Sequence, residues 1–174
     1  MVTSFHRDTA GRVLEAFSPA ERDLTEVAEC LGREPTIAFR VAARYARTGE
    51  ILVIESLPVA SDGSPNPNWM WLVHRSLKKV IDRLEASGGV KRAERAVGEV
   101  GIARSHALYR SGRNALCAEL GLEPLSGGVG GARVGVKCLH AHVAFHLAGG
   151  YSPVGRWALS EIGSGDYGEV SVGS

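Results

Sequence analysis

Apolar residues recur at intervals of three and four in several segments, which is the spacing of an amphipathic helix. Ser18-Pro19 is typical of a helix start, and Gly32 is expected to end the helix that follows it. Ser76 is expected to cap a second helix, which Gly88-Gly89 would end. Further helices are predicted over residues 91–120, with a break near Gly98 or Gly101, over residues 136–148 and over residues 154–162.

Other segments show the patterns of β-strands. Residues 37–43 alternate with a period of two, as a strand with one buried face does, and residues 51–54 are uniformly apolar. The turn signal Thr48-Gly49-Glu50 between them predicts a hairpin. Residues 69–73 are a third strand candidate, whereas the prolines within residues 58–68 predict a loop. The sequence therefore predicts an α+β fold, with a small antiparallel sheet of about three strands packed against several helices.

The chain of 174 residues has the length of one domain. Residues 1–20 are expected to be a weakly ordered lead-in, residues 21–162 a single α+β domain, and residues 163–174 a flexible tail. The formal net charge of +1 does not suggest a general binder of nucleic acid, because such proteins usually carry a strongly basic surface.

The cysteines indicate the compartment in which the protein works. Cys30, Cys117 and Cys138 are odd in number and widely spaced, which argues against a disulfide scaffold and for a reducing environment. The first twelve residues contain no apolar stretch suited to a signal peptide, and no segment approaches the roughly 20 apolar residues of a membrane span. A cytoplasmic location without membrane contact is expected.

Residues 126–142 concentrate the candidate chemistry in a glycine-rich segment followed by a cysteine and histidines. Glycines such as Gly130 and Gly131 let backbone amides point at an anion, and a following helix start adds free N–H groups. Arg133 and Lys137 would supply full charges, so the segment is a candidate site for a small phosphate-type ligand. It lacks the residue order of a Walker A loop. The alternative is a connector whose glycines only permit a tight turn.

The same segment offers ligands for a metal. On a regular helix Cys138, His142 and His146 would share a face, and His140 would join Cys138 only if the cysteine lay at an unwound helix start. One helix supplies too few ligands for a closed site, so a divalent metal such as zinc would need others from elsewhere. Two alternatives remain open: Cys138 is a buried thiol, or Cys138 and His140 act as catalytic nucleophile and base.

A second class of function is a non-catalytic interaction module. Trp69 and Trp71 share one face of the third predicted strand, and the helical segments that follow carry basic residues. These basic residues are Lys78, Lys79, Lys91 and Arg92. Such a surface would bind a protein or nucleic-acid partner. The sequence assigns neither a reaction nor a protein partner, and whether the chain is an enzyme stays open.

Several short tracts together resemble the bacterial domain of unknown function 501 family. They are Leu31-Gly32-Arg33, Asp62 to Pro67, Trp71-Leu72, Arg83 to Gly89, Gly135 to His142, and Pro153-Val154-Gly155. The resemblance covers roughly residues 24–162, and its most specific part is Lys137-Cys138-Leu139-His140. It implies an uncharacterised bacterial protein of the cytoplasm.

The resemblance also implies a shared Cys/His metal site. Many members carry a cysteine after the first strand and a Thr-Cys-Pro tract after the third. In this chain Tyr45 and His74 stand at those two places. These departures leave two alternatives: this chain lacks the metal site, or it has a three-ligand site of His74, Cys138 and His140. An open fourth position is typical of a catalytic metal site.

Overall fold

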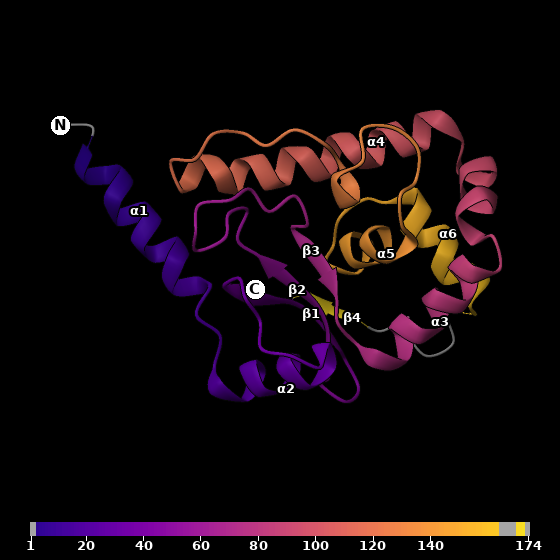
Figure 1. Cartoon of the computed structure of the whole chain (residues 1–174), viewed down its shortest axis with the longest axis horizontal. Coiled ribbons are helices and arrows are strands. Elements are labelled where there is room, and N and C mark those ends of the chain that lie inside the picture. The colour runs from indigo at the N-terminus through magenta and orange to yellow at the C-terminus, as the bar shows by residue number, and fades with distance from the viewer. Residues whose placement is uncertain (1–2, 164–169, 173–174) are drawn as a thin grey trace.

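One antiparallel sheet lies at the centre of the computed structural model, which describes residues 3–163 and 170–172 (Figure 1). Its strands are β1 (Phe39–Tyr45), β2 (Ile51–Ser56), β3 (Met70–Leu72) and β4 (Val170–Val172). They are ordered β3-β2-β1-β4, so β2 and β1 are the inner strands. The α+β fold and the three predicted strands are confirmed. β4 lies in the segment expected to be a flexible tail, and residues 164–169 and 173–174 of that tail lie outside the described residues.

Helices cover both faces of the sheet. They are α1 (Thr3–Ala16), α2 (Glu21–Leu31), α3 (Arg75–Ala86), α4 (Gly89–Glu119), the short 3₁₀ helix η1 (Val129–Gly131), α5 (Leu139–Leu147) and α6 (Pro153–Glu161). The segment expected to be a weakly ordered lead-in thus contains α1, which extends away from the rest of the molecule in Figure 1. The predicted break in the long helix is at Gly98, whose φ of 72° and ψ of 165° are not helical.

β2 is buried along its whole length, which explains why its sequence is uniformly apolar. On one side of the sheet, α2 covers a small apolar cluster that includes Val27 and Ile51. On the other side, α5 packs against β2 and β3, and α3, α4 and α6 surround it (Figure 1). The first turn of α5, where the candidate residues lie, is therefore fixed by several elements at once.

Two buried polar side chains of α4 hold the long loops in place. The Tyr109 hydroxyl accepts the Trp69 amide at 2.6 Å and donates to the Pro67 carbonyl at 3.2 Å. The guanidinium of Arg113 is fully buried and donates to the carbonyls of Pro67 and Leu125, and also to those of the two residues after Leu125. Buried carbonyls need donors, so these bonds tie the proline-rich loop and the glycine-rich loop to one helix.

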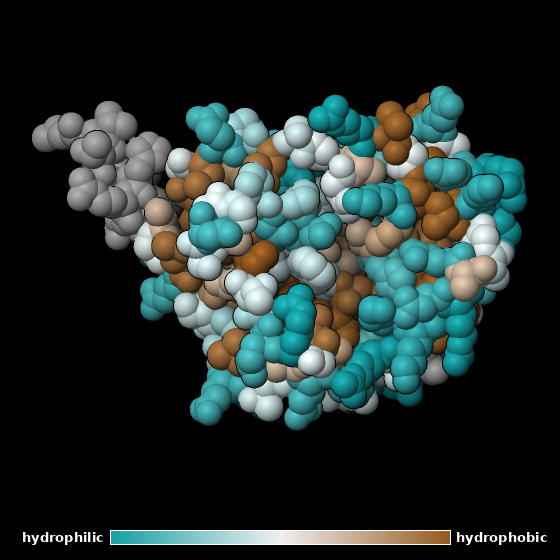
Figure 2. Space-filling model, viewed as in Figure 1, coloured by the Kyte–Doolittle hydropathy of each residue, from teal (hydrophilic) through white to brown (hydrophobic). Residues whose placement is uncertain are grey.

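The outer surface on the face drawn in Figure 2 shows hydrophobic residues in separate patches among hydrophilic ones. Hydrophilic side chains gather over α3, at the lower right of that view. Within the described residues, no helix combines the length and the apolar character that crossing a membrane requires.

Candidate functional site

Helix α5 begins at Leu139, three residues later than the sequence pattern predicts, and Cys138 is its N-cap. Gly135 has a left-handed φ of 67°, which breaks a helical path, and the Val136 amide donates to Glu94 Oε1 at 2.9 Å instead of joining the helix. Cys138 is extended, and its Sγ accepts the Ala141 amide at 3.3 Å. The cysteine thus lies at the unwound helix start, the one arrangement in which it was expected to join His140.

Two carboxylates of α3 reach the start of α5. Oε1 of Glu85 accepts the Leu139 amide and lies 3.2 Å from Nδ1 of His140. Oδ1 of Asp82 lies 3.1 Å from Nε2 of His140. Residues three apart on a helix share a face, so Asp82 and Glu85 flank the imidazole from the same side of α3. Asp82 also pairs with Lys78 at 3.1 Å.

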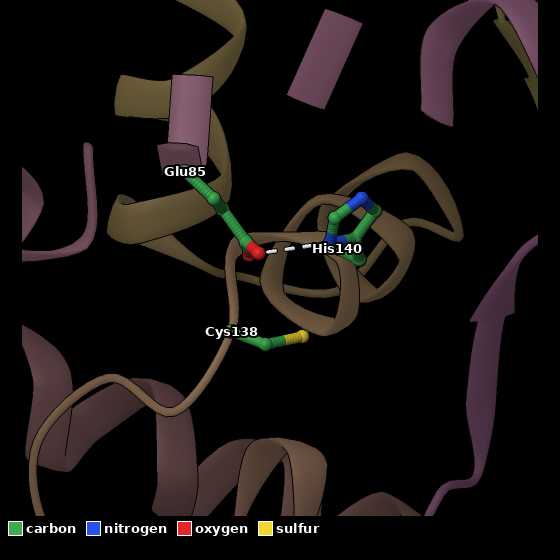
Figure 3. A group of neighbouring side chains, drawn as sticks. All are labelled: Glu85, Cys138 and His140. Atoms are coloured by element: carbon green, nitrogen blue, oxygen red, sulfur yellow. Dashed lines mark hydrogen bonds and ion pairs between the residues drawn. The ribbon is translucent and has the colours of Figure 1, made fainter. Parts of the chain in front are cut away.

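Glu85, Cys138 and His140 form a compact group of potential metal ligands. One ligand atom from each residue lies within 4.8 Å of the others. Figure 3 shows the Glu85 carboxylate directed at the imidazole and Cys138 on the chain that leads into the helix. All three are partly exposed, so solvent can reach them. Sulfur, imidazole nitrogen and carboxylate oxygen are the three donor types that zinc accepts in proteins.

The surroundings of His140 act on its pKa in opposite directions. Burial alone would lower the pKa, but side-chain hydrogen bonding with Cys138 and the nearby charges of Glu85 and Asp82 raise it above the ordinary value of 6.5. These surroundings favour positive charge on the imidazole, and the same carboxylates would favour a bound cation.

The other predicted metal ligands do not join this group. His74 is the N-cap of α3, because its Nδ1 accepts the Leu77 amide at 3.3 Å, and this role had been expected of Ser76. His142 is fully buried, with its Nδ1 2.9 Å from Ser152 Oγ. Burial, aided by the nearby His106, lowers the pKa of His142 to about 3, so its ring is neutral. Among the described residues, Glu85, Cys138 and His140 are the one such group of potential metal ligands.

The protein's own carboxylates occupy backbone amides of the predicted anion-binding segment. Glu85 accepts the first amide of α5, and Glu94 accepts that of Val136. Gly130 and Gly131 have left-handed φ angles of 62° and 76° in η1, where they shape a tight turn. An external anion at the helix start would have to displace Glu85.

The two predicted cations are on the surface, and the structure does not bring them into the ligand group. Arg133 and Lys137 are both exposed. Arg133 lines a separate hollow along α4. The two parts of the glycine-rich segment therefore lie in different places. Its end contains Cys138 and His140 at the start of α5, whereas Arg133 in its middle lies beside α4.

Sequence reasoning missed the two acids of α3. Asp82 and Glu85 lie on the polar face of a helix that the pattern predicted correctly, where acids usually contact only water. The Arg83 to Gly89 tract of the family resemblance includes Glu85 and was the available signal.

Comparison with known proteins assigns the chain to a family, and no curated protein or solved structure matches it. The family model described as "Protein of unknown function (DUF501)" matches residues 42–160, a range that contains Glu85, Cys138 and His140. Because the family model matches more than half of the sequence, the chain belongs to the DUF501 family.

Proposed function

We propose that this protein binds a divalent transition metal, with zinc the preferred ion, through Glu85, Cys138 and His140. The observation that carries the proposal is the convergence of sulfur, nitrogen and oxygen ligand atoms within 4.8 Å, with Glu85 more than 50 positions before Cys138 and His140 in the sequence. A cysteine that binds a metal needs other ligand atoms close to its sulfur, and here His140 and Glu85 supply them.

The secondary structure supports the three side chains in the way that metal sites require. Cys138 is fixed by its capping bond to Ala141, and Glu85 by the amide of Leu139. Each ring nitrogen of His140 has a carboxylate nearby, but only Nδ1 is hydrogen-bonded, to Glu85. Nε2 has no hydrogen-bond partner among the described residues. A carboxylate that is hydrogen-bonded to a histidine fixes its orientation and makes it a better ligand.

Three protein ligands leave room for a further one. A metal bound by three side chains and water is typical of a catalytic site, where it lowers the pKa of the water and polarises a substrate oxygen. Within this arrangement the chain's own contribution is to hold the ligands at the edge of the core, where solvent reaches them. We therefore favour an open metal site over a closed structural one.

The test is metal analysis of the protein purified without a histidine tag. We expect about one equivalent of bound zinc, or tight uptake of added zinc and of cobalt. Cobalt should give the near-ultraviolet absorption of a thiolate-to-metal transition, which shows that a cysteine is a ligand. Cys138→Ser is the informative variant, because serine is a favoured N-cap and preserves the helix start while it removes the sulfur.

Cys30→Ser is the matched control, because Cys30 is a free, half-buried thiol like Cys138 but lies on α2. The proposal requires that the cobalt band disappears in Cys138→Ser and persists in Cys30→Ser, with circular dichroism unchanged in both. A protein that takes up neither zinc nor cobalt, or a band that survives in Cys138→Ser, would overturn it.

A further inference from the structure

A hollow of about 790 Å³ lies between the first half of α4 and the loop that contains Arg133. Its volume is in the range of pockets for small molecules, which is about 300–1,000 Å³. Lys91, Arg95 and Arg133 supply positive charge to its lining, and Ile102 and Val134 supply apolar surface. None of the three proposed metal ligands lines it.

The three cations around this hollow have no ion-pair partner in the part of the chain that the structure describes. Two arginines elsewhere do have close acidic partners: Arg40 lies 2.7 Å from Glu55, and Arg44 lies 2.7 Å from Asp23. Two acids, Glu94 and Glu99, also line the hollow. Glu94 accepts the Val136 amide through one oxygen and keeps its charge, so three cations face two carboxylates and the lining has an excess of positive charge.

The position of the cations on α4 adds to the positive potential. Lys91 lies in the first turn of the helix, where the aligned peptide dipoles already carry partial positive charge and acids are favoured. The first turn of α4 contains no acid. Lys91 and Arg95 are four residues apart and share a face. An anion bound at this face would be attracted by the side chains and by the helix start together.

The loop that carries Arg133 is held firmly against α4. Nδ1 of His106 accepts the Val129 amide at 3.1 Å, so its Nε2 carries the proton and donates to the Gly135 carbonyl at 2.8 Å. A side chain at Gly128 would collide with His106, its Cβ lying 2.4 Å from the ring nitrogen. These bonds fix both ends of the segment around Arg133, so the hollow exists before a ligand arrives.

We infer that this hollow binds a small organic anion, in which a phosphate or carboxylate group meets Lys91, Arg95 and Arg133 and an apolar body lies against Ile102 and Val134. Val134 is 85 % exposed, and a ligand in the hollow would cover part of it. The inference uses other residues than the metal site and does not depend on it.

Calorimetric titration with phenyl phosphate, benzoate, inorganic phosphate and benzyl alcohol tests the inference. Phenyl phosphate or benzoate should bind at one site, more tightly than inorganic phosphate and far more tightly than the uncharged alcohol. Arg133→Gln should weaken binding roughly tenfold, since a charge-assisted hydrogen bond contributes about 1.5–3 kcal/mol and each 1.4 kcal/mol is a factor of ten.

Arg110→Gln is the matched control, because Arg110 is an exposed arginine of α4 that does not line the hollow. It should leave the affinity unchanged, as should Cys138→Ser, which separates this site from the metal site. The inference is overturned if neither organic anion binds saturably at millimolar concentration, or if Arg133→Gln and Arg110→Gln lower the affinity equally. Equal affinity for phenyl phosphate and inorganic phosphate would overturn the role of the apolar wall.

Discussion

Replacing Arg113 with methionine is the most direct test of how the loops around the candidate site are held. Arg113 is fully buried, and among the described residues its hydrogen bonds go to backbone carbonyls rather than to a carboxylate. Burial lowers the pKa of this guanidinium below its ordinary value of 12.5. Methionine fills much of the same space, so the change mainly removes the donors and the charge.

The magnitude follows from the bonds. One terminal nitrogen donates to Pro67 at 3.3 Å, and the other shares two hydrogens among three carbonyls at 2.7, 3.1 and 3.0 Å. That geometry allows about three full bonds, each of about 1.5–3 kcal/mol. The desolvation of the buried charge offsets part of this sum. We therefore expect Arg113→Met to lower the free energy of unfolding by about 3–5 kcal/mol, because the buried carbonyls lose their donors.

Urea denaturation followed by circular dichroism measures this difference, with chelator present so that metal does not contribute. Arg110→Met is the control, because Arg110 lies on the same helix but is exposed, and its effect should stay within about 0.5 kcal/mol. A loss below about 1 kcal/mol for Arg113→Met would show that water replaces the guanidinium at these carbonyls. The account of the loops as tied to α4 would then be wrong.

Burial keeps His142 neutral, so the folded state should lose stability as the pH falls from 6.5 towards about 3, because the unfolded chain takes up this proton first. The loss should be roughly 1 kcal/mol per pH unit, and urea melts of His142→Gln with chelator should show a flatter dependence. Cys138→Ala should cost about 1 kcal/mol in metal-free thermal melts through loss of the cap, whereas Cys138→Ser should cost less; equal losses would argue against capping. Gly128→Ala should cost about 1–3 kcal/mol because its Cβ would lie 2.4–2.6 Å from atoms of His106, and urea melts should show no comparable loss for Gly11→Ala, whose Cβ meets nothing within 4 Å.

Local patterns predicted most of the architecture, because the burial of a strand or a helix face leaves a periodic trace in the sequence. The hairpin of β1 and β2 and the kink at Gly98 are of this kind. β4 could not be found in the same way, since it has three residues and its place beside β1 depends on chain that is distant in sequence. The start of α5 was misplaced because Glu94, more than 40 positions earlier, takes the Val136 amide.

The candidate site shows the same division between local and distant information. Cys138 and His140 were identified from their own segment, and the condition for their meeting, an unwound helix start, was stated in terms of local geometry. Glu85 and Asp82 come from another helix, and their polar positions are indistinguishable from solvent-facing ones. Only packing of α3 against α5 reveals which acids turn toward the imidazole.

The acids of α3 and α4 also explain why one glycine-rich segment gives rise to two proposed sites rather than one. Glu85 and Asp82 place two carboxylates beside the start of α5, so this end favours a cation and suits a metal. Glu94 accepts the Val136 amide, and around the hollow it and Glu99 are outnumbered by three cations. Arg133, on the loop between, is left with Lys91 and Arg95 and faces solvent. The unequal distribution of acids and cations thus separates a proposed cation site from a proposed anion site along a few residues of chain.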